Sequence, residues 1–407
     1  MKKIQGGITA AKGFEAAAVA AGIKYENRLD LALIYSEKPC KIAGTFTTNI
    51  IKAAPVKWDQ AIVGGKKKCQ AVVVNAGIAN ACTGEEGMQY CVETAQTVAN
   101  ALNLEREEIL IGSTGVIGMP MPMEKLKKGI EILAKKKAKG YEAGKEAARA
   151  IMTTDTCEKE IAVTFEIDGQ VITIGGMAKG SGMIHPNMCT MLSFITTDAC
   201  ISKKALQQAL RMDVEETYNM ISVDGDTSTN DTVLLLANGM AGNKKIKYGT
   251  KEWELFCDAL HEVNLTLAKK IAEDGEGATA LLEVIVEGAS SKEQARKLAK
   301  SVICSNLTKT AIAGHDANWG RILCAMGYAG VEFFPERTHL SIKSKKGELC
   351  LVEGGVAVSY SEEKATKILS EPEVTVLIHI GEGEETATAW GCDLTHGYID
   401  INADYRS

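Results

Sequence analysis

The sequence predicts an α/β fold of the layered α+β kind, with mixed sheets, helices and two tightly packed lobes. The chain has 407 residues, and at roughly 150 residues per domain this length corresponds to two or three domains or lobes. Short apolar runs rich in Val and Ile alternate with long helical patterns. Only 7 residues are proline, and no proline-rich linker divides the chain, so we expect the lobes to pack against each other.

In the first half of the chain, apolar runs predict strands at Ala71–Val74 and Ile109–Ile111. Apolar residues spaced three and four apart predict helices at Gln89–Leu102 and Glu124–Ala138. Strands that alternate with helices in this way are typical of an α/β arrangement.

A hairpin is predicted near the middle of the chain. Glu160–Glu166 and Gln170–Gly175 alternate apolar and polar residues, and Asp168-Gly169 lies between them. An Asp-Gly pair between two alternating runs is a strong signal for a tight turn between antiparallel strands. At least part of the sheet structure is therefore expected to be antiparallel.

The second half of the chain continues the mixture of strands and helices. One predicted helix follows a strand and another precedes one, which favours layered mixed sheets over a simple doubly wound sheet. The predicted strands are Met191–Thr196, Ala280–Val286 and Val374–Ile380, and the predicted helices are Lys203–Ile221, Glu252–Glu273, Lys292–Lys300 and Glu362–Leu369.

The composition argues against several classes of protein. Hydrophobic residues make up 45% of the chain and charged residues 24%, and no run of about 18 uncharged apolar residues occurs. These features argue against a membrane protein and against a disordered one. The formal net charge of −6 offers no basic surface for a nucleic-acid backbone. We therefore expect a small molecule or another protein as the partner.

The cysteines and the N-terminal segment predict a cytoplasmic location. None of the 12 cysteines forms a CxxC pair, so reduced thiols are expected instead of disulfides or metal ligands. Lys12 and Glu15 interrupt the apolar run near the N-terminus, which for that reason does not resemble a signal peptide.

The densest local signal is the glycine-rich segment Gly175–Ala199, which leads into the predicted strand at Met191. A long turn without chemistry is one interpretation of its composition. Thr190 favours another, because it lies where this segment enters the strand. A threonine becomes an effective nucleophile when a base lies beside it, and cleavage of the Cys189–Thr190 bond would make its own α-amino group that base.

The segment KGSGMIHPNMCTML around Thr190 resembles the signature of the ornithine acetyltransferases of arginine biosynthesis, the glutamate N-acetyltransferase family. The resemblance extends over essentially the full chain. Further motifs follow in the family's order: GFEAAAVAAGIK, AGTFTTN, NAGIANACTG, GSTGVIG, MTTDT, SVDGDTSTNDT, DGEGAT, HDANWGRI and INADYRS.

This resemblance implies a self-cleaving precursor. Cleavage before Thr190 would give an α chain, residues 1–189, and a β chain, residues 190–407, and the family usually assembles as α2β2. The implied reaction moves an acetyl group from N-acetylornithine to glutamate through an acetyl-Thr190 intermediate, with no cofactor. Acetyl-CoA as a second donor stays open, and recycling of the acetyl group comes first.

The resemblance also assigns the residues of the site. Thr114 and Gly115, in a GSTGVIG loop expected after Ile109–Ile111, would stabilise the oxyanion; the spacing of this motif does not fit a nucleotide-binding loop. Lys179 would bind the α-carboxylate instead of being a solvated loop lysine, and Glu276 would steer an amine or hold a water. The substrate contacts are Thr153, Lys179, Thr190, Glu276, Asn402 and Ser407.

Three positions depart from the family's usual pattern, and one of them is Ala317 in HDANWGRI, where the family more often has proline. Cys189 stands where the family usually has alanine, and its thiol could compete as the nucleophile that cuts the chain. We expect cleavage before Thr190, because the rest of the signature is kept. Ser407 replaces a threonine and keeps the hydroxyl group.

The remaining polar motifs have structural interpretations. His185 is expected to make a turn-stabilising hydrogen bond, with a proton carrier as the alternative. His315 beside Asp316 lacks further ligands at metal-binding spacing, so no metal is expected. The oxygen-rich Ser222–Asp231 does not match a calcium loop, and we expect turn and cap roles.

Two other functions remain open from the sequence. An N-acyl amino acid amidohydrolase on the same scaffold would pass the acetyl group from Thr190 to water. A ligand-binding protein would hold an anion in its glycine-rich loops and form no covalent species. The expected partners in all three cases are small molecules, amino acids above all, and neither a nucleic acid nor a membrane.

Overall fold

The computed structural model describes residues 1–185 and 191–404, and these form two compact units. Unit 1 comprises the described residues of 1–180, 186–219 and 227–271. Unit 2 comprises 181–185, 220–226 and the described residues from 272 onward. The predicted class, a layered α/β or α+β fold with mixed sheets, is confirmed.

The described part of unit 1 contains nine strands that run in the order β1-β6-β7-β8-β10-β3-β4-β5, with β2 paired to β3. The long strand β3 belongs to both halves, because its first residues pair with β2 and β4 and its last residues pair with β10. The bounds are β1 Lys2–Ile4, β2 Phe14–Val19, β3 Leu31–Phe46, β4 Cys69–Ile78, β5 Ile109–Val116, β6 Lys159–Ile167, β7 Gln170–Lys179, β8 Leu192–Thr197 and β10 Thr232–Ala237.

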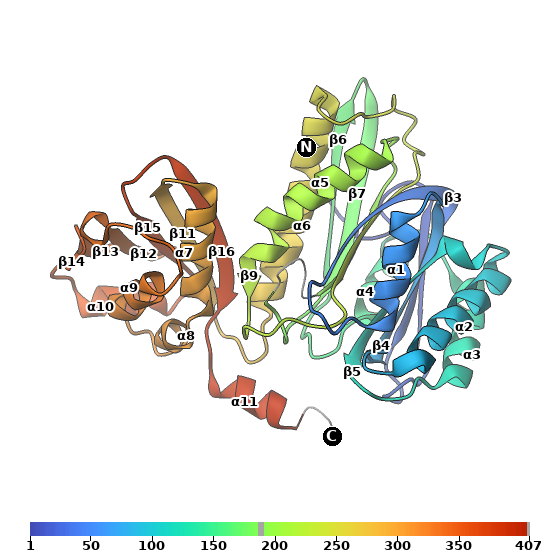
Figure 1. The fold of residues 1–407 in the computed structure, drawn as a ribbon, viewed down its shortest axis with the longest axis horizontal. Helices are drawn as coiled ribbons and strands as arrows, with labels where there is room; N and C mark the ends of the chain where they lie inside the picture. The colour runs from blue at the N-terminus through green and yellow to red at the C-terminus, as the bar shows by residue number, and fades with distance from the viewer. Residues whose placement is uncertain (186–190, 405–407) are drawn as a thin grey trace. The chain divides into compact units, whose positions relative to one another are not determined.

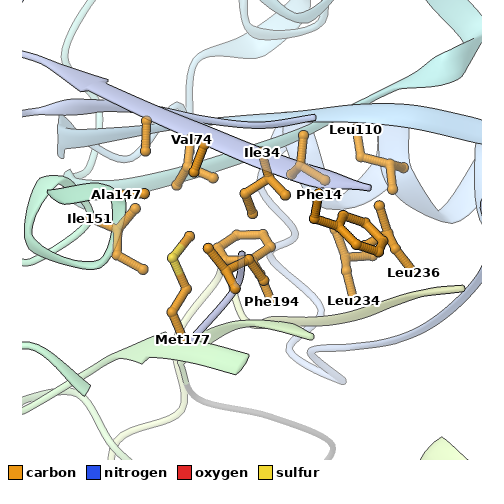
Figure 2. Packing of buried hydrophobic residues seen from close by; sticks show 14 of the residues in the cluster. Phe14, Ile34, Val74, Leu110, Ala147, Ile151, Met177, Phe194, Leu234 and Leu236 are labelled. Atoms are coloured by element: carbon orange, nitrogen blue, oxygen red, sulfur yellow. The ribbon is translucent and has the colours of Figure 1, made fainter. Parts of the chain in front are cut away.

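The two halves of this sheet face each other across one apolar core. Phe14, Ile34 and Val74 from the β2–β4 half pack against Phe194 and Leu234 from the β8–β10 half (Figure 2). Every residue of β8 and β10 is buried, as expected for neighbouring parallel strands covered on both faces.

Helices cover the outer faces of both halves (Figure 1). Helices α2 (Gly84–Leu102) and α3 (Met123–Lys136) pack their apolar faces on β2, β3, β4 and β5. On the other side, α6 (Lys251–Glu273) lies along β6 and β7, where the rings of Phe256 and Phe165 meet edge to face. Trp253 of α6 donates its indole N–H to Ala205 O of α5 (Lys203–Glu216), which joins the two helices of this layer.

The predicted hairpin is confirmed. Strands β6 and β7 are antiparallel, and Asp168 and Gly169 form the two-residue connection with φ values of 51° and 75°. Positive φ at both positions is what a tight type I′ turn requires, and Asp-Gly is suited to it.

Two boundaries differ from the predictions. The helix predicted at Lys203–Ile221 ends at Glu216, because Ile221 and Ser222 leave unit 1 and form strand β9 of unit 2. The expected loop at GSTGVIG is wrong in its first half, because β5 continues through Val116. Parallel pairing with β4 along this stretch satisfies the backbone groups on one side of β5, which is the last strand in the order.

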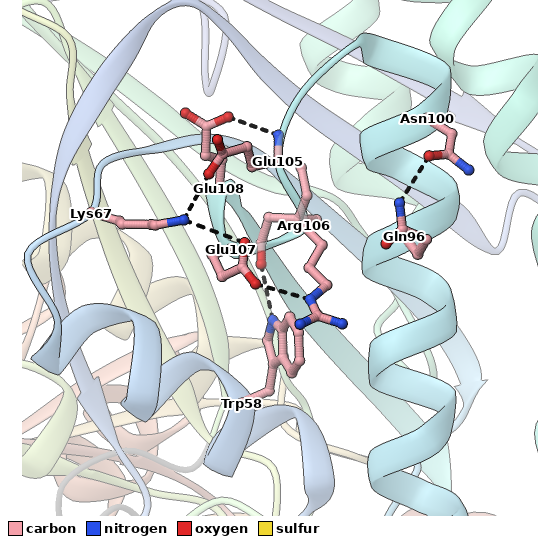
Figure 3. A network of polar contacts seen from close by, with 9 residues as sticks. Trp58, Lys67, Gln96, Asn100, Glu105, Arg106, Glu107 and Glu108 are labelled. Atoms are coloured by element: carbon pink, nitrogen blue, oxygen red, sulfur yellow. Dashed lines mark hydrogen bonds and ion pairs between the residues drawn. The ribbon is translucent and has the colours of Figure 1, made fainter.

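A polar network holds the start of β5 (Figure 3). Lys67 forms ion pairs with Glu105 at 2.7 Å and Glu107 at 3.4 Å, and Trp58 Nε1 donates to Ile109 O at 2.9 Å. Behind the network, the buried carboxylate of Asp59 accepts the backbone N–H of Ile111 at 2.9 Å. Because the exposed ion pairs contribute little individually, we attribute the anchoring of β5 chiefly to the Trp58 and Asp59 bonds, which satisfy its backbone.

The described part of unit 2 contains a seven-stranded mixed sheet in the order β14-β13-β12-β15-β11-β16-β9. Helix α7 (Lys292–Cys304) packs on β11 and β16, and helix α11 (His396–Ala403) lies near the end of the chain. The strand bounds are β9 Ile221–Ser222, β11 Leu281–Ala289, β12 His339–Ser344, β13 Gly347–Glu353, β14 Val356–Ala357, β15 Glu373–His379 and β16 Glu385–Cys392. The remaining helices of the two units are α1 Ala54–Gly64, α4 Tyr141–Ala150, α8 Asn306–Ala313, α9 Trp319–Gly327 and α10 Glu362–Leu369.

No helix within the described ranges is both long and apolar enough to span a membrane.

Candidate active site

Four strands of unit 1 meet at the point where β8 begins. Lys179, the last residue of β7, pairs with Leu192, the first residue of β8, and Leu192 also pairs with Thr232 of β10. Asn230, just before β10, donates its side-chain amide to Ser113 O of β5 at 2.8 Å. The predicted residues Thr114 and Lys179 are therefore carried by strand ends that converge on the start of β8.

The residues at the predicted cleavage bond, Cys189 and Thr190, lie outside the described residues. The chain is described again from Met191, whose carbonyl oxygen accepts the backbone N–H of Thr232 at 2.9 Å. This bond fixes the residue that follows Thr190 to the start of β10.

Thr114 and Gly115 lie near the end of β5. In this fully described strand they are the two partly exposed residues, and the other six are buried. Gly115 pairs with Gly77 of β4 at a register shift and has a φ of 128°. A Cβ at Gly115 would lie 2.2 Å from the carbonyl carbon of Gly77, so glycine is required for this close approach. One hydroxyl and one backbone N–H are thus presented side by side at an accessible strand end.

Lys179 is buried, with only 8% of its surface exposed. The interpretation of a solvated loop lysine is therefore wrong. Its ammonium group lowers the pKa of two carboxyl groups, Asp155 and Asp231, which places a positive charge between them. For Asp231, burial is the larger effect, and its pKa lies well above the usual range.

Thr153 is held through its backbone. Its N–H donates to Asp155 Oδ2 at 3.0 Å, and its carbonyl oxygen accepts from the guanidinium of Arg28 at 2.7 Å. Both bonds use backbone atoms of Thr153, and neither uses its hydroxyl group. Thr153 and Lys179 are thereby connected to the same carboxylate, that of Asp155.

In unit 2 the structure brings Glu276 and Asn402 together. Asn402 on α11 donates its side-chain amide to Glu276 Oε2 at 2.7 Å, and the backbone N–H of Glu276 donates to Ser181 O at 2.9 Å. Gly182 lies against the carboxylate, because a Cβ there would come within 2.2 Å of Glu276 Oε2. Glu276 is 7% exposed. Ser407, the last predicted contact, lies outside the described residues.

Comparison with known proteins decides the family. A sequence model of the ArgJ family matches residues 15–407. The chain belongs to the ArgJ family. This confirms the resemblance inferred from the sequence motifs, and with it the prediction of an enzyme of arginine biosynthesis.

Relatives of this ArgJ-family chain match it over nearly its whole length. A protein of Caldanaerobacter subterraneus named "Arginine biosynthesis bifunctional protein ArgJ" is 52% identical over 407 residues and covers 100% of both chains. A protein of the same name from Thermotoga neapolitana is 50% identical over 398 residues, which cover 97% of this chain and 99% of the relative. A solved chain of the Bacillus halodurans protein is 46% identical with a TM-score of 0.50, and the match covers 53% of this chain and 99% of that chain.

In this ArgJ-family chain the motif Ser222–Asp231 makes the predicted turn bonds: the backbone N–H of Asp226 donates to Asp224 Oδ1 at 3.2 Å, and that of Asn230 donates to Ser228 Oγ at 3.1 Å. The motif also makes long-range bonds. Asp224 accepts the backbone N–H groups of Met183 at 2.6 Å and Ile184 at 2.8 Å, and Tyr398 of α11 donates its hydroxyl to the same carboxylate at 3.3 Å. Burial raises the pKa of Asp224. Asp224 therefore ties Met183 and Ile184, which precede the predicted cleavage bond, to the helix that carries Asn402.

His185 makes hydrogen-bonded contacts with two residues from distant segments, and the turn-stabilising bond expected from the sequence stays a prediction. Its Nδ1 lies 3.1 Å from Ser222 Oγ and 3.5 Å from Cys304 Sγ. Burial, reinforced by the nearby Lys300, lowers its pKa to about 4, so the imidazole is neutral at neutral pH. Within the described residues, no group of three or more His, Cys, Asp or Glu side chains is placed to hold a metal ion.

Asp155 is a residue that the sequence analysis missed. It lies in the quoted motif MTTDT, and an acidic residue in a threonine-rich motif next to a predicted substrate contact is the signal that could have identified it.

Proposed function

We propose that this chain transfers an acetyl group from N2-acetyl-L-ornithine to L-glutamate in the cytoplasm, through an acetyl ester on Thr190. The precursor first cuts itself at the Cys189–Thr190 bond, which gives Thr190 a free α-amino group. Thr114 and Gly115 act as the oxyanion donors, and the substrate contacts are Thr153, Lys179, Glu276, Asn402 and Ser407.

The placement of Lys179 is the observation that carries this proposal. Its ammonium group is buried at the end of β7, and its backbone pairs with Leu192, two residues after Thr190. Both substrates share an α-carboxylate, and a buried lysine is a suitable point charge for it. Membership of the ArgJ family supports the same reaction.

Two acyl transfers make up the proposed reaction. Oγ of Thr190 attacks the acetyl carbonyl carbon while its proton passes to the α-amino group. The C–N bond then breaks, ornithine leaves with that proton, and the acetyl ester remains. The amine of glutamate next attacks the ester, and Thr190 Oγ regains a proton as N-acetylglutamate leaves. An α-amino group with an ordinary pKa of about 7.7–8.0 suits this exchange near neutral pH.

Oxyanion stabilisation is the proposed role of the β5 end. Each donor aimed at the developing charge is typically worth about 2.7–4 kcal/mol of barrier. The Thr114 hydroxyl and the Gly115 N–H are two such donors, and their partial exposure in β5 leaves them open to a substrate.

Two observations support cleavage into chains that stay together. Strand β8, from the proposed β chain, lies between β7 of the α chain and β10 of the β chain, so backbone hydrogen bonds would hold the cut halves in one sheet. The match with the solved Bacillus halodurans chain covers 99% of that chain but only 53% of this one. The proposed β chain, residues 190–407, has 218 of the 407 residues, about 54%, which is close to that share. We also propose two copies of each chain in the assembly.

The test compares intact masses and acetyl transfer for the wild type and Thr190→Ala. The wild type should give fragments 1–189 and 190–407 and form N-acetylglutamate, whereas Thr190→Ala should remain one chain and lose transfer. Thr366→Ala, at an exposed position of α10, is the matched control and should behave like the wild type. Normal cutting of Thr190→Ala, or a β chain that begins at Cys189, would contradict the proposal.

The same samples separate the alternative functions. Brief exposure to N-acetylornithine should leave an acetyl group on the fragment that begins at Thr190. Release of acetate without N-acetylglutamate would indicate an amidohydrolase, and a fragment that is never acetylated would indicate a ligand-binding protein. Because the relatives are named bifunctional, acetyl-CoA is the second donor to supply in place of N-acetylornithine.

A further inference from the structure

One buried carboxylate, that of Asp155, connects the two proposed substrate contacts of unit 1. Its side chain is fully buried in the connection between α4 and β6. Oδ2 accepts the backbone N–H of Thr153 at 3.0 Å. Oδ1 accepts the backbone N–H of Gly180, directly after Lys179, at 2.6 Å and Nζ of Lys159 at 2.7 Å. Three donors from separate segments therefore meet on one side chain.

The charges around Asp155 keep it ionised. Burial alone would raise its pKa, but Lys179, Lys159 and the Gly180 N–H together lower it to about 2. Asp231 is the other acidic group near Lys179, and its raised pKa favours the neutral form. Two ammonium groups, those of Lys179 and Lys159, therefore stabilise the ionised carboxylate of Asp155.

Asp198 provides a comparison at the opposite end of the same strands. Its buried carboxylate accepts the backbone N–H groups of Thr173 at 2.8 Å and Lys12 at 3.1 Å. The β7–β8 ladder runs from Ile174 and Thr197 at that end to Lys179 and Leu192 at the other, about 17 Å at 3.4 Å per residue. Asp198 thus holds backbone N–H groups on a buried carboxyl group as Asp155 does, but the proposed contacts Thr153 and Lys179 do not lie beside it.

We propose that Asp155 is a positioning residue, which holds Thr153 and Lys179 in the arrangement that binds the α-carboxylate common to both substrates. Asp155 itself does not touch the substrate; it acts through the two residues beside it. Fixed donors bind a carboxylate more tightly than mobile ones, because less side-chain freedom is lost on binding. This inference rests on the proposed function.

Steady-state kinetics of Asp155→Asn and Asp198→Asn test this role. Asparagine removes the negative charge and cannot accept all three hydrogen bonds. Charge-assisted bonds of this kind typically correspond to tenfold or larger effects. We expect Asp155→Asn to raise KM about tenfold or more for both N-acetylornithine and glutamate, with kcat changed less than about threefold. Asp198→Asn should keep both KM values.

The pH dependence supplies a readout that a purely structural residue would not change. The charged groups that face Asp155 are Lys159 at the start of β6 and Lys179 at the end of β7, with Asp231 beyond Lys179 and Arg28 on the Thr153 carbonyl. Loss of the carboxylate makes an ammonium group easier to deprotonate. In Asp155→Asn, KM should therefore begin to rise at a lower pH than in the wild type.

Asp155→Glu decides the question if Asp155→Asn does not fold. Glutamate keeps the charge, but its extra methylene group moves the oxygens away from one of the two backbone N–H groups, so both KM values should rise at least about threefold. Wild-type KM values in the folded variant would overturn the proposal. So would equal KM changes in Asp155→Asn and Asp198→Asn. A wild type that transfers no acetyl group would instead overturn the proposed function, and this outcome is distinct from a failure of the Asp155 proposal alone.

Discussion

The close approach of β4 and β5 leads to a specific prediction for Gly115. A Cβ added there would lie 2.2 Å from the carbonyl carbon of Gly77 and 2.4 Å from its oxygen, whereas ordinary contact begins at 3.4 Å. Gly115→Ala must therefore push the two strands apart by about 1.2 Å or turn a peptide group. Its φ of 128° is also one that L side chains rarely adopt.

The cost of Gly115→Ala follows from two contributions. Residues forced into sparsely populated backbone conformations typically cost about 1–3 kcal/mol. One or two broken ladder hydrogen bonds add about 1 kcal/mol each. The two contributions sum to an expected loss of about 2–5 kcal/mol in the free energy of unfolding, with a fall in transfer rate because the donor pair is displaced.

Gly118→Ala is the matched control in the same motif. Gly118 also has a positive φ, 78°, but a Cβ there would meet nothing within 4 Å. The left-handed conformation alone costs an L residue about 1–2 kcal/mol. Urea denaturation followed by tryptophan fluorescence compares the two variants. A difference of less than about 1 kcal/mol between them would refute the steric argument, and so would unchanged transfer in Gly115→Ala.

Two further predictions concern buried groups. Asp59 is fully buried, and burial raises its pKa well above 3.8. Between the unfolded and the folded pKa, the folded protein therefore holds a proton that the unfolded chain releases. The stability of the fold falls as the pH rises from about 4 through the folded pKa of Asp59. Asp59→Asn should therefore gain stability relative to the wild type across that window in urea titrations, and a pH-independent difference would contradict it. Burial raises the pKa of the Cys40 thiol to about 12, and its strand partner Cys69 is equally buried. A thiol reagent should label the exposed Cys82, Cys157 and Cys324 first, and peptide mapping that finds Cys40 labelled as fast as Cys82 would argue against the buried β3–β4 pair.

Local signals were sufficient for the elements that local chemistry specifies. The β6–β7 turn was predictable because Asp168 and Gly169 accept positive φ and the flanking runs alternate. The end of α5 was not, because Ile221 is drawn into pairing with Trp390, 169 residues further along the chain. Helix propensity cannot reveal such a partner, and tertiary pairing overrides it.

The site divides in the same way. Family motifs identified Glu276 and Asn402, and the structure shows that they are hydrogen-bonded to each other. The motifs did not identify Asp155, because its proposed role depends on a residue 25 positions away. The backbone N–H of Gly180 donates to the Asp155 carboxylate. Hydroxyl and glycine residues at GSTG suggested a loop, but the missing side chain at Gly115 lets β5 continue beside the backbone of Gly77 on the neighbouring strand.

Glycine makes up 39 of the 407 residues, above the average usage of about 7%, and at two places the structure gives a physical reason for it. At Gly115 the absence of a side chain lets β5 approach β4 and present Thr114, and at Gly182 it lets the segment before the cleavage region lie on the carboxylate of Glu276. A Cβ would lie under 3 Å from the Gly77 backbone at the first position and from the Glu276 carboxylate at the second, whereas a Cβ at Gly118 would meet nothing within 4 Å. Close approach of the backbone is therefore what brings residues from distant segments into contact here. At these two positions glycine matters because its missing side chain leaves room for a neighbouring residue, and its own flexibility is secondary.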